Sequence, residues 1–263
     1  MGWPPELVER ARAVRDGRVA AAPPRDAATV VLLRDGVSGP QAYLLRRVRA
    51  MAFGAGMHVF PGGSVDPADA DTDIAWAGPP VSWWAQALLA DEPRARSLVC
   101  AAVRETFEEC GVLLAGPAED ELLPDVSTDE WEAERVALEA REQTLSDLLA
   151  RRRLVLRTDL LRPLAHWITP EFEPKRFDTR FFLAAMPSGQ VARDVGGEAD
   201  ARVWVRPRDA LDSALPMMPP TAATLAELAA SVDVAAALAV ERTITTVQPR
   251  YVVDGDELQL VVG

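Results

Sequence analysis

Lysine is almost missing from this chain: Lys175 is the single one among 263 residues, and arginine supplies the other basic side chains. We interpret this as a bias of composition rather than of function. Acidic residues outnumber basic ones by 40 to 28, which gives a formal net charge of −12. So acidic a surface repels nucleic acid, which argues against nucleic acid as a general partner. A small anionic ligand needs only a local basic patch and is not excluded.

Long apolar runs and cysteines are also scarce. No run of about 18 apolar residues occurs, so we expect no membrane span. The stretch MGWPPELVERARAVRDG has no hydrophobic signal core, and LQLVVG carries no retention or peroxisomal address. Cys100 and Cys110 are the two cysteines, and on one helix they would lie about 15 Å apart, too far for a disulfide. We therefore expect a reduced, cytoplasmic protein.

Local patterns predict both strands and helices. ATVVLLRDG and QAYLLRRV predict a hairpin beginning near Ala28, and SLVCAAVRETFEECG predicts a helix capped by Ser97 and ending at Gly111. Residues 127–153 predict a second helical region broken near Thr144, most of whose charges we interpret as a solvated face. Further expected elements are the strands RFDTRFFLAAMP and ARVWVRP, three short helices after residue 206, and a final hairpin around Asp254-Gly255.

Three glutamates crowd the end of the first predicted helix, in RETFEECGVLL. At 100° per residue, Glu105, Glu108 and Glu109 cover about a third of the circumference. Like charges at this spacing destabilise a helix, and the helix dipole disfavours negative charge at this end. A solvated acidic face is the ordinary explanation, but a divalent cation, which takes carboxylate ligands together with substrate phosphates, explains the crowding better. The opposite side carries an apolar stripe of Val99, Val103, Phe107 and Cys110.

RETFEECGV resembles the second half of the Nudix box, G-x5-E-x7-R-E-U-x-E-E-x-G-U, in which U is aliphatic. Thr106 departs by replacing an aliphatic residue. The first half is present in PGGSVDPAD, where Gly63 followed by five residues leads to Asp69 in place of the family's glutamate. The seven-residue spacer would then put the arginine at position 77, but it stands at 104, so 27 residues are inserted inside the motif.

An insertion at this point resembles one Nudix subgroup, the coenzyme A diphosphatases of the peroxisomal type. Their preceding signature is approximately L-L-x-R, a glycine, three residues and F-P-G-G. LLRRVRAMAFGAGMHVFPGG supplies it through Leu44, Leu45, Arg47, Gly56 and the FPGG of 60–63. Residues 51–55 depart, because other coenzyme A enzymes carry a further arginine there. The resemblance covers roughly residues 27–115 well.

The resemblance implies an α/β/α sandwich in a single domain, 1–263, with a central mixed sheet and a catalytic helix. Helical insertions at about 71–97 and 117–165 would wall the substrate pocket, and a helical extension would cover about 207–242. The implied reaction is Mg²⁺- or Mn²⁺-dependent hydrolysis of a pyrophosphate bond in a nucleoside diphosphate derivative. We favour coenzyme A or acyl-coenzyme A, cleaved to a phosphopantetheine and adenosine 3′,5′-bisphosphate. ADP-ribose, NADH or another nucleotide stays open, as does a non-catalytic nucleotide-binding protein.

The resemblance also assigns roles to single residues. Glu105, Glu108 and Glu109 would hold the metal, helped by a backbone carbonyl near Gly62 or Gly63. Arg104 would pair with a box carboxylate and fix its rotamer. The general base would be Glu105 or a loop carboxylate, for which Glu198 is the candidate and Asp200 its competitor, although Glu198 could equally be an exposed loop acid.

Substrate contacts are expected before the motif. Arg46, Arg47 and Arg49 match phosphate geometry, with Gly56 and Phe60 beside them, unless these arginines only decorate a strand edge. Other candidates are weaker. Arg176 and Arg180 are further candidate phosphate ligands. His58 and His166 are interpreted as structural. One of the tryptophans could stack on adenine instead of filling the core, and the candidates are Trp76, Trp83, Trp84 and Trp131. The apolar stripe within 221–240 could support a homodimer or pack on the protein's own core.

Overall fold

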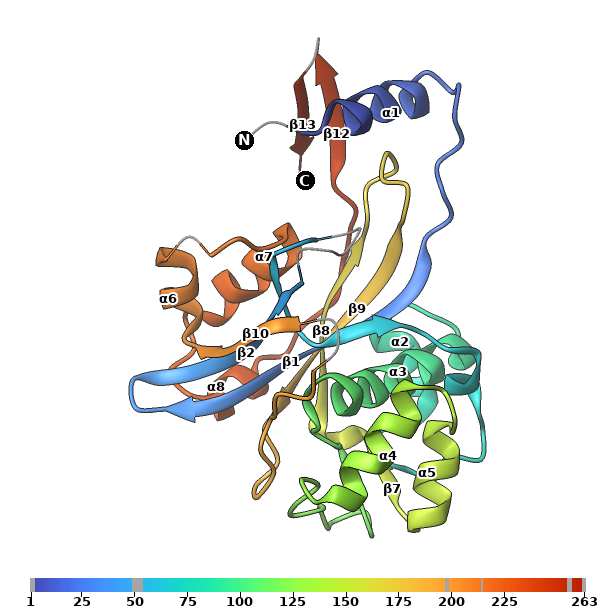
Figure 1. Ribbon diagram of the computed structural model, residues 1–263, viewed down its shortest axis with the longest axis vertical. Helices are drawn as coiled ribbons and strands as arrows, with labels where there is room; N and C mark the ends of the chain where they lie inside the picture. The colour runs from blue at the N-terminus through green and yellow to red at the C-terminus, as the bar shows by residue number, and fades with distance from the viewer. Residues whose placement is uncertain (1–2, 49–53, 197–198, 214, 255–256, 262–263) are drawn as a thin grey trace.

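A mixed β-sheet runs through the middle of the molecule (Figure 1). The computed structural model describes residues 3–48, 54–196, 199–213, 215–254 and 257–261. The strand order is β10–β2–β1–β9–β8–β11, with β3 beside β2 and β4 beside β1. The sheet strands are β1 (Arg25–Gly36), β2 (Gly39–Arg47), β3 (His58–Val59), β4 (Gly62–Ser64), β8 (Leu161–Ile168), β9 (Phe177–Ala185), β10 (Ala199–Val205) and β11 (Thr246–Val247).

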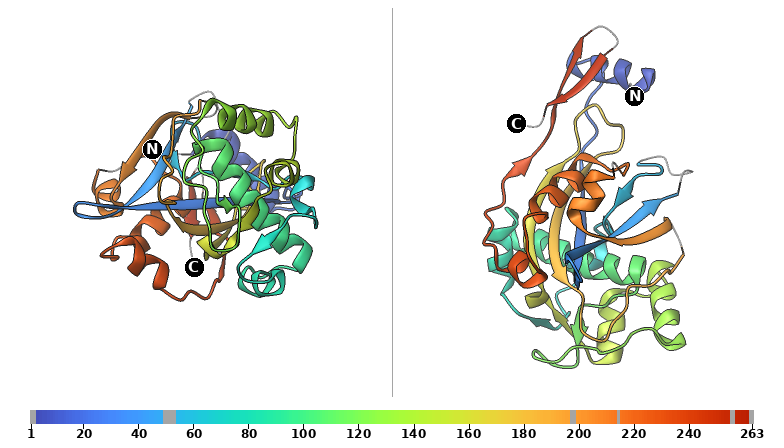
Figure 2. Two further views of the ribbon diagram at one scale, coloured as in Figure 1. Left: turned by 90° about the horizontal axis from the view of Figure 1, so that it is seen from below. Right: turned by 90° about the vertical axis from the view of Figure 1, so that its left-hand side faces the viewer.

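Helices cover both faces of this sheet, as Figures 1 and 2 show together. One face carries α2 (Val81–Ala87), α3 (Glu92–Cys110), α4 (Asp129–Glu139) and α5 (Leu145–Arg152). The other face carries α6 (Pro207–Asp212), α7 (Pro219–Leu228) and α8 (Val234–Ala239). The predicted sandwich with a central mixed sheet is therefore confirmed.

The position of β1 at the centre of the sheet explains why the sequence predicts it as a strand. β1 pairs in parallel with β9 and antiparallel with β2, so it is enclosed on both sides and both faces. The four residues at 30–33, VVLL, are all fully buried. A continuous apolar run of this length is what a strand buried on both faces requires.

The helix α3 starts earlier than the sequence predicts. The N-cap of α3 is Asp91, whose carboxylate accepts from the backbone N–H of Arg94 at 2.8 Å. Ser97 therefore lies inside the helix, where its hydroxyl donates to the carbonyl of Pro93 at 3.0 Å. The predicted cap was wrong because the helix extends further toward the N-terminus and begins at Glu92, five residues before Ser97. The predicted end is confirmed, since Gly111 closes the helix in the left-handed region with φ 65°.

Two apolar clusters flank the sheet. The predicted stripe on α3 is fully buried in the cluster on its own face. On the other face, Leu225 and Leu228 of α7 pack into the second cluster beside Val234 of α8. The C-terminal apolar stripe thus packs on the protein's own core. A homodimer stays a prediction that would need a different surface.

The predicted insertions contain more than helices. Two short strands within them, β5 (Trp76–Ala77) and β7 (Val155–Arg157), pair with each other, and β7 also pairs with β6 (Ala115–Gly116). Two 3₁₀ turns, η1 (Pro67–Ala70) and η2 (Thr158–Leu160), flank them. Because β8 begins at Leu161, the predicted range 117–165 runs into the central sheet, and its helical part ends with α5 at Arg152.

A separate small module stands beside the sandwich at the top of Figure 1. It consists of α1 (Pro5–Arg15), which we did not predict, and the hairpin β12 (Arg250–Asp254) with β13 (Glu257–Val261), which we did. Phe172 fills its small core and meets the Tyr251 ring edge-on, with centroids 5.1 Å apart. Among the described residues, no helix is both long and apolar enough to cross a membrane.

Candidate active site

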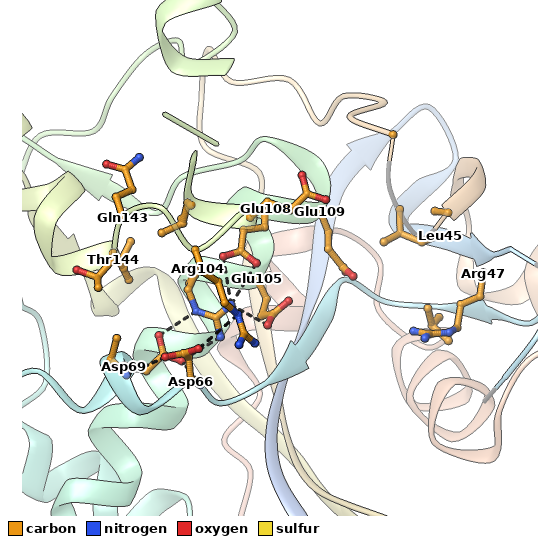
Figure 3. A pocket seen from close by; sticks show the side chains of 18 residues that line it. Leu45, Arg47, Asp66, Asp69, Arg104, Glu105, Glu108, Glu109, Gln143 and Thr144 are labelled. Atoms are coloured by element: carbon orange, nitrogen blue, oxygen red, sulfur yellow. Dashed lines mark hydrogen bonds and ion pairs between the residues drawn. The ribbon is translucent and has the colours of Figure 1, made fainter. Parts of the chain in front are cut away.

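A cavity of about 350 Å³ opens between the C-terminal half of α3, η1 and the connection from α4 to α5. Both halves of the interrupted motif line it, Asp69 from η1 and the glutamates from α3. In Figure 3 the three glutamates lie between Gln143 and Thr144 at one end and Arg47 at the other. The lining residues are Leu45, Arg47, Val59, Asp66, Ala68, Asp69, Arg104, Glu105, Glu108, Glu109, Leu138, Glu139, Arg141, Gln143, Thr144, Leu145, Gly196 and Ala199.

Asp69 and Arg104 join the two motif halves across the insertion. The Arg104 guanidinium donates from Nε to Asp69 Oδ1 and from Nη2 to Oδ2, both at 2.9 Å. This two-pronged pairing matches the fork of a guanidinium to a carboxylate. Asp69 is 1% exposed and is held from the other side by the backbone N–H of Asp66 at 2.8 Å. Aspartate therefore fits the place of the family's glutamate.

Arg104 also holds two of the box glutamates. Its Nη1 donates to Glu105 Oε1 at 2.8 Å and to the two Glu108 oxygens at 3.2 and 3.1 Å. Nη2 further donates to the carbonyl of Ser64 at 2.9 Å. We name Arg104, Asp69, Glu105 and Glu108 the Arg104 cluster. It gathers three carboxylates around one guanidinium.

Glycines bring the β4 backbone against the glutamates. The N–H of Gly62 donates to Glu109 Oε2 at 2.8 Å. A Cβ added to Gly63 would stand 2.5 Å from Glu105 Oε1, closer than real side chains come. Only glycine leaves room for this carboxylate against the strand, which agrees with the predicted close approach of the backbone.

The carboxylates of the cluster hold protons more tightly than free ones. Burial raises the pKa of Glu105 to about 7; the charge of Arg104 opposes the rise and Glu108 adds to it. Burial also raises the pKa of Glu108 and of Asp69, although Arg104 acts against it in both. Burial acts to lower the pKa of Arg104, but its bonds to Asp69 and the neighbouring carboxylates outweigh this and raise it. One cation is too little for three buried acids.

The chemistry of these donors fits a hard divalent cation. Glu105, Glu108 and Glu109 offer carboxylate oxygens in the lining of the cavity, and a cation would supply the positive charge that the cluster lacks. Among the residues that the structure describes, no three acidic, histidine or cysteine side chains are already gathered as a metal site. Glu105 bonds Arg104 through Oε1, whereas Glu108 bonds it through both oxygens, so Glu108 would share its oxygens between Arg104 and a cation.

The expected substrate residues divide between the cavity and other places. Arg47 lines the cavity, whereas Arg46 pairs with Asp200 at 2.7 Å on the exposed surface. Phe60 is 3% exposed within the apolar cluster on the opposite face, so the structure places it away from the cavity. Gly56 has φ 71° and donates its N–H to the carbonyl of Arg47, and it does not line the cavity. Arg49 and Glu198 lie outside the described residues.

Arg176 and Arg180, expected as further phosphate ligands, are buried structural residues. Arg176 donates to the carbonyls of Thr169 and Ala22. Arg180 is 1% exposed and belongs to what we name the Asp178 cluster. In it Arg94, Arg180 and His166 all contact Asp178, and Arg94 also contacts Asp26.

The histidines and tryptophans take no part in the described cavity lining. His166 bonds Asp178 at 2.6 Å and Thr246 at 2.9 Å, which confirms its structural interpretation. Trp84 is fully buried in the core, and Trp131 packs edge-on against Phe107.

Several lining residues come from the α4–α5 region, whose charges we had interpreted as mostly solvated. Arg135 is the clearest correction: it is 2% exposed and donates to the carbonyl of Glu108 at 2.8 Å and to Glu139 at 2.7 Å. It thereby supplies positive charge to the C-terminal end of α3, in addition to that of Arg104. The spacing from Arg135 to Glu139 signals an ion pair, but nothing in it signals burial.

Comparison with known proteins agrees with this geometry. Residues 85–221 match the NUDT19 Nudix domain, a span that covers the glutamates but begins after Asp69. The crystal structure of a Nudix hydrolase from Alicyclobacillus acidocaldarius superposes with a TM-score of 0.69 at 32% identity. That alignment covers 84% of this chain and 98% of the other. The chain therefore belongs to the Nudix family.

A curated relative is more distant. Acyl-coenzyme A diphosphatase NUDT19 of Xenopus laevis is 24% identical over 212 residues, which are 68% of this chain and 56% of the relative. The chain thus spans little more than half of that protein's length. Nudix hydrolases generally use divalent metals and act on small nucleotide substrates.

Proposed function

We propose that this protein hydrolyses the pyrophosphate bond of coenzyme A or acyl-coenzyme A, with Mg²⁺ or Mn²⁺, to a phosphopantetheine and adenosine 3′,5′-bisphosphate. The observation that carries the proposal is the joining of Asp69 to Arg104, which brings the two halves of an interrupted motif to one cavity. The similarity to the Xenopus laevis acyl-coenzyme A diphosphatase supports the choice of substrate.

The metal would be held by Glu105, Glu108 and Glu109 with the Gly63 carbonyl. When bound, it neutralises the polyanionic pyrophosphate and makes a coordinated water more acidic. Nothing else in the cavity lining supplies this much positive charge at the three glutamates among the described residues, because Arg104 is already engaged by Asp69.

The side chains of the chain have separate tasks in this proposal. Arg104 keeps Glu105 and Glu108 oriented, and Asp69 in turn keeps Arg104 in place. Glu105 is our candidate to take the proton of the attacking water on Oε2, since Oε1 accepts from Arg104. Water oxygen then bonds to one phosphorus as the bridging oxygen leaves with the other phosphate.

The first test is a substrate panel. The purified protein is incubated with coenzyme A, acetyl-coenzyme A, ADP-ribose, NADH and dinucleoside polyphosphates, with Mg²⁺ or Mn²⁺, and products are identified by mass. Phosphopantetheine and adenosine 3′,5′-bisphosphate are the expected products. Cleavage of ADP-ribose or NADH alone would contradict the coenzyme A assignment and leave the metal site in place.

A Glu109→Gln variant provides the matching control. The amide oxygen that this substitution introduces can still accept from the Gly62 N–H, so we expect the fold to be kept while hydrolysis is lost. Circular dichroism and the unfolding temperature check the fold. Unchanged hydrolysis in this variant would contradict the role of Glu109 as a metal ligand.

The cellular setting is part of the proposal. Both cysteines are free and buried, and burial raises the pKa of Cys100 to about 12, so its thiol is unreactive at neutral pH. Cytoplasmic location agrees with such thiols, and fractionation of the native host with an antibody to this chain would test it.

A further inference from the structure

Arg141 lies in the connection that leads from α4 into α5, and it lines the cavity. Its backbone is fixed by the turn that ends α4: its N–H donates to Leu138 at 2.9 Å, and the next N–H donates to Ala137 at 2.8 Å. The side chain is 81% exposed. Within the described chain it faces Asp66, with Nε 3.7 Å from Oδ2, which is longer than a hydrogen bond. The guanidinium donors of Arg141 are therefore available to a ligand.

The charges of the cavity set Arg141 apart. Three arginines line it among the described residues. Arg104 is saturated by carboxylates, and Arg47 lies at the far end from the α4–α5 connection (Figure 3). Arg141 is thus the cation that the inserted helices bring to the cavity. A polyanionic substrate entering this acidic site would meet it on the side away from Arg47.

Arg141 does not stand over the glutamates themselves. A chain of contacts separates them: Arg104 bonds Glu105 and Asp69, Asp69 is bonded by the Asp66 N–H, and Asp66 faces Arg141. A pyrophosphate held at the glutamates is therefore displaced from Arg141 by the width of this chain. A second anionic group on the same substrate is what Arg141 is placed to meet.

We propose that Arg141 binds a phosphate monoester of the nucleotide, separate from the pyrophosphate that is cleaved. Its guanidinium fork matches two phosphate oxygens at once, which a lysine does not. In coenzyme A this group is the 3′-phosphate of the adenosine, so Arg141 selects nucleotides that carry it. The identity of the substrate here rests on the proposed function, whereas the phosphate subsite rests on the cavity.

Arg153 offers a matched control. It follows α5 as Arg141 follows α4, with a similar left-handed backbone, φ 55° against 59°, and its N–H donates to Ala150 at 3.1 Å as that of Arg141 donates to Leu138. It is exposed and does not line the cavity. Both arginines stand where glycine is preferred, so replacing either by glycine should not lower stability. Because Arg153 has the same left-handed backbone, that conformation alone does not indicate a function for Arg141. What distinguishes Arg141 is that its charge lies in the cavity lining.

The test compares binding of adenosine 3′,5′-bisphosphate and AMP by calorimetry with Mg²⁺ present. We expect the wild type to prefer the bisphosphate by about tenfold, the strength of one charge-assisted phosphate contact. Arg141→Ala and Arg141→Gly should remove the preference and leave AMP affinity within about twofold. Arg153→Ala and Arg153→Gly should keep it. Equal loss for both ligands, or no preference in the wild type, would overturn the subsite.

Kinetics give a second measure that separates this inference from the proposed function. With coenzyme A, Arg141→Ala should raise KM about tenfold and change kcat less than about twofold, and with 3′-dephospho-coenzyme A it should change neither. Arg141→Lys should restore part of the loss. A wild type that prefers the bisphosphate but cleaves no coenzyme A would contradict the proposed function and support the subsite. Cleavage of coenzyme A without any effect of Arg141 would do the reverse.

Discussion

The two ion clusters on the α3 face of the sheet contain similar residues but differ in their balance of charge. The Asp178 cluster joins two arginines and a histidine to two aspartates, so its charges are balanced. The Arg104 cluster sets one arginine against three carboxylates. The first has no place in the cavity lining, and the second forms much of it. Of the two clusters, therefore, only the Arg104 cluster at the cavity carries surplus negative charge.

The difference appears in the acids themselves. In the Asp178 cluster burial acts to raise the pKa of Asp178, but bonds from His166 and Arg94 and the charge of Arg180 bring it well below its ordinary value. In the Arg104 cluster burial prevails, and the pKa of Glu105 rises to about 7. A buried acid whose pKa falls stabilises the folded state, and one whose pKa rises is kept at a cost in stability.

Glu105→Gln is expected to show the largest effect. It should lower kcat about a thousandfold, because a metal and its bound water supply several kcal/mol of transition-state stabilisation. The unfolding temperature should stay or rise, since a buried acid with a raised pKa is removed. Kinetics with coenzyme A and thermal unfolding measure both. A stable variant with near wild-type turnover would show that the surplus charge has no catalytic use.

Asp178→Asn should do the opposite. It leaves the buried Arg180 guanidinium without its carboxylate, so we expect about 3 kcal/mol less stability against urea. Turnover of the folded fraction should be unchanged at low temperature. Asp209→Asn is the control: Asp209 is 46% exposed and its partner Arg206 is 41% exposed, so this substitution should cost far less stability than Asp178→Asn. Equal effects at both sites would mean that the Asp178 cluster does not hold the fold together.

The pH dependence of stability should have opposite signs in the two clusters. In metal-free protein, Glu105 binds its proton more tightly folded than unfolded, so stability falls as pH rises from 4.5 to about 7. Glu105→Gln should remove a fall of at most roughly 3 kcal/mol. The contribution of Asp178 is fully present above its unfolded pKa of 3.8 and is lost as pH falls below that value. Urea titrations with a chelator, from acid to mildly alkaline pH, would check both; a flat wild-type profile contradicts the first.

The smallest effect is expected at Thr106, the motif position where an aliphatic residue is usual. Its side chain is fully buried, and its hydroxyl donates to the carbonyl of Ala102 at 2.7 Å. Thr106→Val keeps the shape and removes a hydroxyl already satisfied within the helix. We expect stability to change by less than about 1 kcal/mol and turnover to stay the same. A large loss of activity would assign Thr106 a role that its contacts do not indicate.

The sequence predicted what depends on neighbours in the chain. The apolar stripe of α3, the hairpin of β1 and β2, the break before α5 and the left-handed Gly111 follow from local periodicity and turn chemistry. The pairing of Asp69 with Arg104 agrees with motif positions that lie far apart in sequence. The order of the motif residues indicated that Asp69 and Arg104 belong to one site, which the pattern of helices and strands alone does not indicate.

The rest depended on contacts between distant segments. Arg135 has the pattern of an exposed helix charge, and only the docking of α4 on α3 buries it. Phe60 belongs to a glycine-rich motif that leads to the cavity, yet its own side chain packs in the other core. Arg141 has no local signal at all, because the path of the α4–α5 connection decides what it faces.

The split motif has a consequence for how such sites tolerate inserted sequence. Between Asp69 and Arg104 the chain runs through 34 residues where the family pattern has seven. The entropy of closing a loop grows only with the logarithm of its length, so this lengthening costs about 1.4 kcal/mol. A buried two-pronged bond between Arg104 and Asp69 can offset a cost of that size. The catalytic constellation can therefore survive the growth of a new segment within it, provided that the closing bond is kept.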